Sequence, residues 1–426
     1  MIERSIIQAT MHGNSQVSRR GMLKSIAVGA GLSGLGFHDL LLAASPNMQK
    51  RGKSVIVLWM QGGPSQFETF DPKEGEAGGQ NGSIESAIPG VRIAETWPKV
   101  AKQMKDITLI RSMTNKEGNH QRATYQLHTG YVPSGSVRHP SFGSLVTSEL
   151  TPETGELPGF VSIAGPSQGS GFLPVAYGPF RVNDPAKMPA NSEITVPDKR
   201  FHRRLGLLKK LETGYAKSGA EQQVLDHQGL YRQASKLVTS PKLDAFDISK
   251  EPEKVRREYG ETAFGNGCLL ARRLVDAGVT YVEVQLGNWD THDDNQNRTK
   301  SLAESCDPAF AALVADLKRR GRLDDTLVVW MGEFGRTPRV NPRGGRDHFP
   351  RAFNVAVAGG GMRGGTVIGK TSSDGSDVAD RPVTVNDLFC TFCKSLGIDP
   401  NKENQSPLGR PMKIVDGGTP VNELLV

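Results

Sequence analysis

The stretch LDDTLVVWMGEFGRTPRVNPRGGRDHFPRAFNVAVAGGGMRGG, residues Leu323 to Gly365, decides how the rest of the chain is interpreted. Its first apolar run, Thr326–Met331, is rich in β-branched residues and too short for a stable helix, which predicts a buried strand. A second apolar run, Phe353–Ala358, ends at three glycines and predicts another strand. The polar segment between the two runs is therefore predicted to be a loop that leaves one strand and enters the next.

This loop carries acids and an imidazole directly after a predicted strand. Glu333 follows the first run, and Asp347 and His348 precede the second. Open α/β sheets bind ligands at the carboxyl ends of their strands, so the arrangement indicates a candidate site. The alternative is a solvated loop in which Glu333 and Asp347 pair with nearby arginines.

The same pattern recurs along the chain. Apolar runs ending near Met60, Met113, Leu286 and Met331 alternate with helical segments, and polar residues follow each run. Alternation of this kind predicts an α/β fold with a doubly wound, largely parallel sheet flanked by helices. The sheet would bring one set of acids and imidazoles to a common edge, namely His120, Asp290, His292, Glu333, Asp347 and His348.

Carboxylates and imidazoles in such a set suit a divalent ion, and Zn²⁺ or Mn²⁺ is expected here. Buried carboxylates need a neutralising partner, and a metal is one solution. Neighbouring arginines are the rival solution, because Arg336, Arg343 and Arg346 lie in the same loop. If a metal is held, the side chains of Asp290 and His292 should converge with those of Glu333 and His348.

Residues 131–262 are expected to form a loop-rich insertion in a single domain that spans 46–426. Residues 131–215 in particular are rich in Pro, Gly and Ser and poor in periodicity, although Gly159–Ile163 predicts a short strand. A long insertion beside a proposed site often shapes substrate access. Helical patterns follow at Glu221–Val238 and Glu253–Gly278.

Charge and cysteine usage exclude some function classes. The net charge of +7 is modest for 426 residues, and the basic residues are mostly interleaved with acids, so no nucleic-acid partner is expected. Cys390 and Cys393 form a C-x-x-C pair on an apolar helical face. Core packing is the favoured interpretation over a redox or zinc pair, because the chain has no second C-x-x-C.

The N-terminus resembles an export signal. Arg19 and Arg20 precede a weakly apolar, glycine-rich run and a small-residue stretch at Leu42–Ser45. This pattern predicts a bacterial twin-arginine (Tat) signal over residues 1–45, transient contact with the Tat machinery and a periplasmic or extracellular location. A membrane anchor is the alternative, but the run is short and broken by glycines. No stable membrane span is expected after signal removal.

Four segments carry a resemblance to a known family. They are QGGPSQFETFDPK, RSMTNKEGNHQRATYQLHTG, YGETAFGNGCLLARRLVDAGVTYVEVQLGNWDTHDDN and MGEFGRTPRVNPRGGRDHFP. With the N-terminal pattern and the closing GRPMKIVDGGTPVNELL, they cover nearly the whole mature chain. On these segments the chain resembles a branch of secreted proteins, the domain of unknown function family 1501. It resembles the alkaline phosphatase and sulfatase superfamily more loosely.

The superfamily resemblance implies an exported, metal-dependent hydrolase of phosphate or sulfate esters, acting on a small-molecule or polysaccharide ester. His348 matches a late histidine of the superfamily, and Asp290 and His292 look like an earlier pair. Phe334 stands where an imidazole would be expected. The metal ligands implied are Asp290, His292, Glu333, Asp347 and His348.

The resemblance leaves the nucleophile open. No Ser, Thr or Cys stands at the expected place before Thr129-Gly130, and that place falls near His120. A metal-activated water, Thr124 or His120 itself are the candidates, and Arg336 or Arg346 would clamp the anion. The competing class is a non-catalytic secreted binding or structural protein with a degenerate site, which the missing nucleophile favours.

Overall fold

The computed structural model describes residues 52–426 except 80–81, 136 and 218–220. Lys53–Val426 form one structural unit. The predicted Tat signal over residues 1–45 lies outside the described residues, and so does the start of the predicted domain at residue 46.

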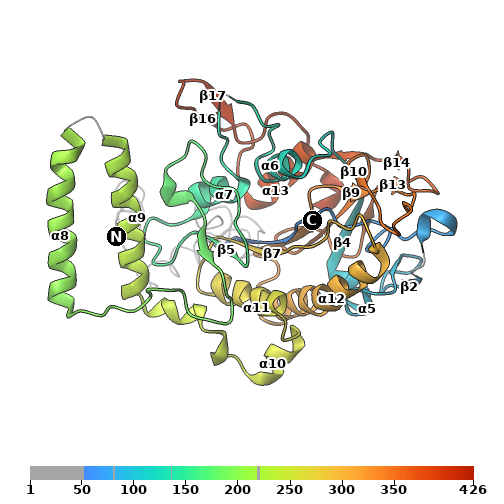
Figure 1. Ribbon diagram of the computed structural model, residues 1–426, viewed down its shortest axis with the longest axis horizontal. Coiled ribbons are helices and arrows are strands. Elements are labelled where there is room, and N and C mark those ends of the chain that lie inside the picture. The colour runs from blue at the N-terminus through green and yellow to red at the C-terminus, as the bar shows by residue number, and fades with distance from the viewer. Residues whose placement is uncertain (1–51, 80–81, 136, 218–220) are drawn as a thin grey trace, which may run out of the picture. The chain divides into compact units, whose positions relative to one another are not determined.

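A central sheet organises the fold (Figure 1). In the described part of the chain it has nine strands in the order β12-β4-β11-β8-β1-β7-β5-β6, with β15 paired to β4. The strand bounds are β1 Ser54–Met60, β4 Ile107–Thr114, β5 Phe160–Ile163, β6 Phe180–Val182, β7 Tyr281–Leu286, β8 Thr326–Met331, β11 Phe353–Ala358, β12 Val367–Ile368 and β15 Val383–Thr384.

Strand direction confirms the expected largely parallel sheet. β1 pairs parallel with both β7 and β8, and β5 pairs parallel with β7 and β6. β11 runs antiparallel to β4 and β8, which makes β4 and β8 parallel to each other. The carboxyl ends of β1, β4, β7 and β8 therefore lie at one edge. The loop between β8 and β11 leaves and returns at that same edge.

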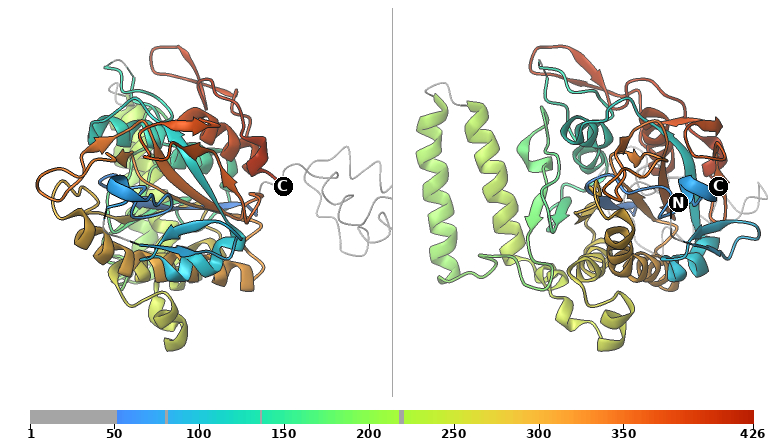
Figure 2. Two further views of the ribbon diagram at one scale, coloured as in Figure 1. Left: turned by 90° about the vertical axis from the view of Figure 1, so that its right-hand side faces the viewer. Right: turned by 45° about the vertical axis from the view of Figure 1, so that its right-hand side comes forward.

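Helices cover both faces of the sheet, as a doubly wound fold requires (Figures 1 and 2). One face carries α5 Pro98–Gln103, α11 Ala263–Asp276 and α12 Asn295–Arg319. The other face carries α6 His120–Thr129, α7 Phe142–Leu150 and α13 Val385–Leu396. All seven residues of β1 are buried, since alternate side chains enter the two cores.

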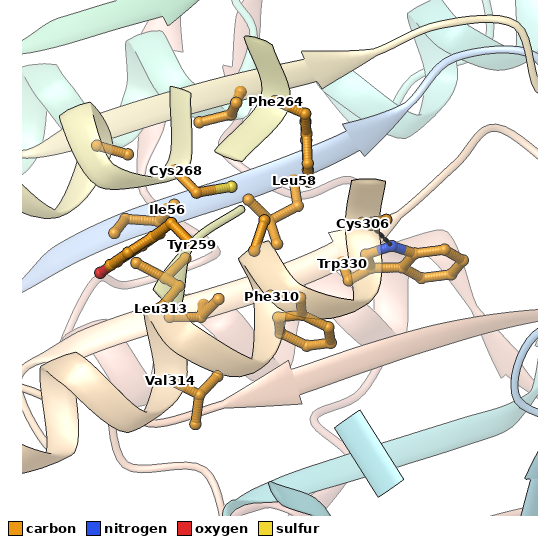
Figure 3. Packing of buried hydrophobic residues seen from close by; sticks show 14 of the residues in the cluster. Ile56, Leu58, Tyr259, Phe264, Cys268, Cys306, Phe310, Leu313, Val314 and Trp330 are labelled. Atoms are coloured by element: carbon orange, nitrogen blue, oxygen red, sulfur yellow. Dashed lines mark hydrogen bonds between the residues drawn. The ribbon is translucent and has the colours of Figure 1, made fainter. Parts of the chain in front are cut away.

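The core on the α11 and α12 face is packed with aliphatic and aromatic side chains (Figure 3). Ile56 and Leu58 of β1 contribute from the sheet, and Phe310 of α12 faces them. Trp330 of β8 donates an indole hydrogen bond to the Cys306 sulfur over 3.3 Å. This core fixes β1 and β8 side by side, and so fixes the loops at their carboxyl ends.

The C-x-x-C pair lies on α13. Cys390 and Cys393 are buried in the second core, and all four cysteines of the chain are free. Burial raises the pKa of the Cys393 thiol, which keeps it protonated. An inert, neutral thiol in an apolar core agrees with the packing interpretation.

The region expected to be loop-rich has more regular structure than its composition indicates. It adds β5 and β6 to the sheet and contains helices α8 Asp198–Tyr215 and α9 Glu221–Thr239. α8 was not predicted. The pattern predicted as one helix over Glu253–Gly278 is two, α10 Glu253–Glu258 and α11, because Gly260 adopts a φ of 73° between them.

None of the helices in the described residues is long and apolar enough to cross a membrane.

Candidate metal centre

Each candidate side chain is delivered by a segment that follows a strand of the central sheet. Asp290 and His292 follow β7, and Glu333 follows β8. His120 is the first residue of α6, after β4, and the Asn119 side chain caps this helix by accepting from the backbone N–H groups of Gln121 and Arg122. His348 lies in β10 (His348–Phe349), which pairs antiparallel with β9 (Gly335–Arg336).

Asp290 lies at the centre of three imidazoles. Its Oδ2 is 3.3 Å from Nε2 of His120. Its Oδ1 is 3.2 Å from Nε2 of His292 and 3.3 Å from Nε2 of His348. The predicted convergence of Asp290, His292 and His348 is therefore present in the fold, with both histidines at one edge of the sheet.

The Nδ1 atom of each imidazole contacts an oxygen atom on the side of the ring away from Asp290. The Nδ1 of His120 lies 2.7 Å from Glu333 Oε1, that of His292 lies 2.8 Å from Asp347 Oδ1, and that of His348 lies 2.8 Å from the Gly118 carbonyl oxygen. Carbonyl and ionised carboxylate oxygens can only accept, so Nδ1 carries the hydrogen in each ring. In the neutral form, all three Nε2 lone pairs then point towards Asp290.

The Nε2 atoms of His292 and His348 make the strongest case for a cation. Nε2 of His292 and Nε2 of His348 are 3.0 Å apart. Two facing lone pairs, with the Asp290 carboxylate oxygen beside them, repel unless a proton or metal ion lies among them. Ligands on a tetrahedral ion at about 2.1 Å are separated by roughly 3.4 Å, so the donor spacing fits such an ion.

A second group of donors overlaps the first. One ligand atom each from His120, Asp290 and His348 lie within 4.8 Å of one another, and these three residues could hold a metal ion. Both groups share Asp290 and His348. The structure thus supports a possible metal site around Asp290 and His348.

Electrostatics favour the ligand forms of these groups. Burial opposes ionisation of Asp290, but the hydrogen bond and charge of Arg336, together with the charges of His120 and His292, outweigh it and lower the pKa of Asp290 to about 2. Burial lowers the pKa of His348, which keeps its Nε2 lone pair available at neutral pH. The hydrogen bond to Glu333 raises the pKa of His120, so this ring holds a proton more readily.

Glu333 and Asp347 lie on the Nδ1 side of the histidine rings, whereas the Nε2 atoms face Asp290. Their oxygens contact ring Nδ1 atoms, on the side of each ring opposite Nε2. Glu333 is fully buried, accepts from the Gly62 backbone N–H over 2.9 Å, and its Oε2 has no hydrogen-bond partner among the described residues. Glu333 and Asp347 were expected to be direct metal ligands. In the structure they instead contact and orient the histidine rings.

The two arginines expected to clamp an anion are both fully buried, and the backbone and carboxylates take up their donors. Arg346 donates to Glu68 Oε1 from Nε and Nη2, and its remaining N–H groups reach carbonyl oxygens of Ala77, Thr337 and Pro338. All five of its donors are thus used, which does not fit the predicted clamp.

Arg336 serves the site differently. It donates to Asp290 Oδ1 over 2.6 Å and also reaches the carbonyl oxygens of Gly62, Gly63 and Trp289. It therefore neutralises one carboxylate, as the rival arginine interpretation expected, but it does so beside the histidine cluster. Asp290 thus pairs with one arginine and also faces the histidine cluster.

Thr124 stands one helical turn beyond His120 on α6. Its backbone carbonyl accepts from Nδ1 of His128, and in the described part of the chain its hydroxyl makes no hydrogen bond to the cluster. The structure thus gives it no visible partner for activation as a nucleophile.

Sequence reasoning missed the roles of Gly62 and Gly118. A Cβ on Gly62, whose φ is 118°, would lie 2.3 Å from the Asp290 backbone nitrogen. Gly62 lets the loops after β1 and β7 approach closely, and its backbone N–H donates to Glu333 Oε1. Both glycines act through backbone atoms, which no residue-type pattern reveals.

Replacing Glu68 with Ala is expected to destabilise the fold while leaving metal content per folded molecule unchanged. Glu68 is 3% exposed and is the carboxylate that pairs with Arg346, so its removal leaves a buried charge unpaired. Such losses cost roughly 3–5 kcal/mol. Urea and thermal unfolding would measure the effect, with the exposed Glu304→Ala as control. A native unfolding midpoint in Glu68→Ala would contradict the structural role of Arg346.

One comparison with known proteins identifies a family, whose description names no activity. The family model described as "Protein of unknown function (DUF1501)" matches residues 52–425. No curated protein matches the chain.

The solved structures that match this chain are distant from it in sequence. PsFucS1 sulfatase from Pseudoalteromonas sp. is 16% identical, with 85% of this chain and 72% of that chain covered at a TM-score of 0.39. The lipoteichoic acid synthase LtaP from Listeria monocytogenes is 11% identical, with 86% and 75% covered at 0.36. The phosphonate monoester hydrolase of Agrobacterium radiobacter is 13% identical, with 87% and 77% covered at 0.32. None of them assigns a role to a residue of this chain.

Proposed function

The chain belongs to the DUF1501 family, and because that description names no activity, we propose a function from the side chains of the site. The protein is a metal-dependent hydrolase of phosphate or sulfate esters. The observation that carries this proposal is the pair of Nε2 atoms of His292 and His348, 3.0 Å apart beside Asp290 Oδ1. Evenly spaced nitrogen and carboxylate donors of this kind are the ligands of catalytic zinc sites that keep a position open.

Asp290, His292 and His348 are the residues that would hold the ion, and Zn²⁺ or Mn²⁺ suits two imidazoles and one carboxylate. Asp347 and the Gly118 carbonyl orient the two imidazoles. A bound divalent ion supplies Lewis acidity, which withdraws electron density from an ester oxygen. The Asp290, His292 and His348 side chains are 45%, 31% and 26% exposed, so a substrate can reach them.

His120 is the residue we assign to proton transfer. Its Nε2 faces the same carboxylate, and Glu333 fixes the proton on Nδ1. In hydrolysis, Nε2 would take a proton from the attacking water. The new oxygen bond to phosphorus or sulfur forms as the bond to the alcohol breaks, and the proton then passes to the leaving alcohol. A covalent intermediate on His120 or Thr124 remains the alternative route.

A second candidate function is supported by the arginines. Arg336 and Arg346 are buried with their guanidinium groups bonded to the protein, so neither is free to hold an ester anion. A secreted protein that binds a ligand through the metal site without turning it over would need no such clamp. The assay below separates this binding protein from the hydrolase.

The test is metal analysis of protein purified from its native host, followed by turnover assays. We expect about one Zn or Mn per chain and hydrolysis of an aryl phosphate or aryl sulfate, with small-molecule and polysaccharide esters assayed next. Removal of the metal with a chelator should abolish turnover, and adding it back should restore it. Metal bound without turnover across the ester panel would favour the binding protein. Absence of any bound metal would overturn both.

Export through the Tat pathway is part of the proposal, with a periplasmic or extracellular destination. Replacing both Arg19 and Arg20 with Lys is expected to leave full-length precursor in the cytoplasm, because the pair precedes a weakly apolar, glycine-rich run. Fractionation and immunoblotting of the native host would measure this, and Lys24→Arg provides a control that keeps the pair. Normal processing of the double variant would count against the Tat route.

A further inference from the structure

α8 is the outermost element of the described fold. It packs against α9, which in turn lies against the body of the protein near the short helix Val175–Tyr177 (Figures 1 and 2). Phe201, Leu205 and Leu208 of α8 line a cleft of about 410 Å³ between the two helices. These residues mark the inner face of α8, and its outer face points away from the protein.

The outer face of α8 combines exposed leucines with basic residues. Leu207 is 57% exposed and Leu211 is 67% exposed. Arg200, Arg204, Leu207 and Leu211 follow one another at spacings of four, three and four residues, which places them on one stripe of the helix. Arg203 and Lys210 flank this stripe.

The acidic residues of α8 do not neutralise that stripe. Asp198 pairs with His202 over 3.2 Å, and the buried Glu212 pairs with His227 of α9. Among the described residues, no carboxylate pairs with the side chains of Arg200, Arg203, Arg204 or Lys210. The outer face is therefore both basic and apolar, with its charges available to a partner.

We propose that this outer face of α8 binds the surface of an anionic phospholipid membrane. Exposed leucines bordered by cations are what an interfacial helix needs, since the apolar side chains enter the lipid boundary while the cations meet phosphate headgroups. A soluble anionic polymer would satisfy the charges but would leave Leu207 and Leu211 in water. In a dimer formed through this face, the basic residues of one copy would lie against those of the other and repel them.

This inference is independent of the proposed hydrolase, because α8 lies outside the cluster around Asp290. It describes peripheral attachment, which is compatible with the lack of a membrane-spanning helix among the described residues.

The test is co-sedimentation of the full-length protein with vesicles of phosphatidylcholine alone or mixed with 30 mol% phosphatidylglycerol. We expect binding to the mixed vesicles that weakens as salt rises. Each basic residue near an anionic surface contributes about fivefold, so Arg203→Gln/Arg204→Gln should weaken binding roughly 25-fold. Leu207→Gln/Leu211→Gln should weaken it at least about tenfold, because the apolar contact is lost.

Residues 1–51 are identical in all variants, so differences among variants report α8. Leu408→Gln/Lys254→Gln is the matched control, since it removes one exposed leucine and one exposed lysine elsewhere and should bind like the native protein. Unchanged thermal midpoints would show that the variants fold. Equal binding of native protein and α8 variants would overturn the proposal. Dimerisation that depends on the same residues would also overturn the proposal. DNA binding that depends on them, without lipid binding, would do the same.

A spectroscopic measurement covers the case in which sedimentation changes are small. All four native tryptophans, Trp59, Trp97, Trp289 and Trp330, are buried, so Leu211→Trp adds an exposed reporter against a shielded background. We expect its emission to shift to the blue, and acrylamide quenching to fall, only with phosphatidylglycerol vesicles. Emission that stays unchanged with those vesicles would overturn the proposal.

Discussion

Asp290→Asn protein is expected to lose its bound metal and, with it, turnover. Asp290 Oδ1 lies 3.2 Å from Nε2 of His292 and 3.3 Å from Nε2 of His348, and no other carboxylate among the described residues contacts both of these atoms. Asn keeps the shape but offers a neutral oxygen, which is a poor ligand for a divalent ion. We expect metal content to fall below detection after dialysis and turnover to fall by at least about 10³-fold, as catalysis through the ion is lost.

Asp347→Asn serves as the matched comparison for that result. Asp347 contacts the same cluster only through Nδ1 of His292, so its loss should weaken metal affinity by about 10–100-fold without abolishing binding. Inductively coupled plasma mass spectrometry and titration with a competing chelator would measure both variants. Native metal affinity in Asp290→Asn would exclude this carboxylate as a ligand. Equal losses in the two variants would show that Asp347 is a direct ligand, as the sequence predicted.

His120→Ala protein is expected to keep the metal and lose turnover by about 10²–10⁴-fold, the usual contribution of a positioned acid or base. The reason is geometric: Nε2 of His120 reaches Asp290 Oδ2, whereas His292 and His348 share Oδ1. Steady-state kinetics with metal content measured on the same sample would separate the two effects. Gln121→Ala, at an exposed position on the same helix, is the control and should keep native activity.

Two outcomes would contradict the role of His120. Unchanged turnover would exclude it from the reaction. Loss of metal together with turnover would make it a ligand, in keeping with its place beside Asp290 and His348.

Glu333→Gln should act through His120. The raised pKa of His120 depends first on the Glu333 hydrogen bond, so the pH at which the ring loses its proton should fall. A shift of the pH–rate profile to lower pH would show that Glu333 positions His120. Loss of a purely structural carboxylate would not produce such a shift.

Local sequence predicted β1, β8 and β11 well because each is a short apolar run in which every residue is buried. Thr326–Met331 and Phe353–Ala358 have the bounds expected for β8 and β11, and β1 ends at Met60 as expected. Prediction was weaker for α8, whose leucines do not all face one side: Leu205 and Leu208 pack inward while Leu207 and Leu211 remain exposed. A helix without a single apolar face gives no clear period to recognise.

The sequence by itself determined the residue types of the site and the strand ends from which they come, because composition and periodicity are local properties. It also predicted that Asp290, His292, Glu333 and His348 would converge, since parallel strands bring their carboxyl ends to one edge. Three of the four do so, and Glu333 does not. The tertiary structure alone decided which groups face inward. Glu333 and Asp347 contact the backs of the histidine rings, and Arg346 is held by Glu68, 278 residues away.

The physical reason lies in how side-chain direction is set. Whether a carboxylate reaches Nδ1 or Nε2 of a histidine depends on ring orientation, which is fixed by contacts such as Gly118 to His348 across 230 residues. The close approach of Gly62 to Asp290 likewise depends on the packing of β1 against β7. Residues in one loop, such as Arg336 and Arg346, look interchangeable in sequence. Only the packed fold places Arg336 beside the candidate metal site and Arg346 against Glu68 in the interior.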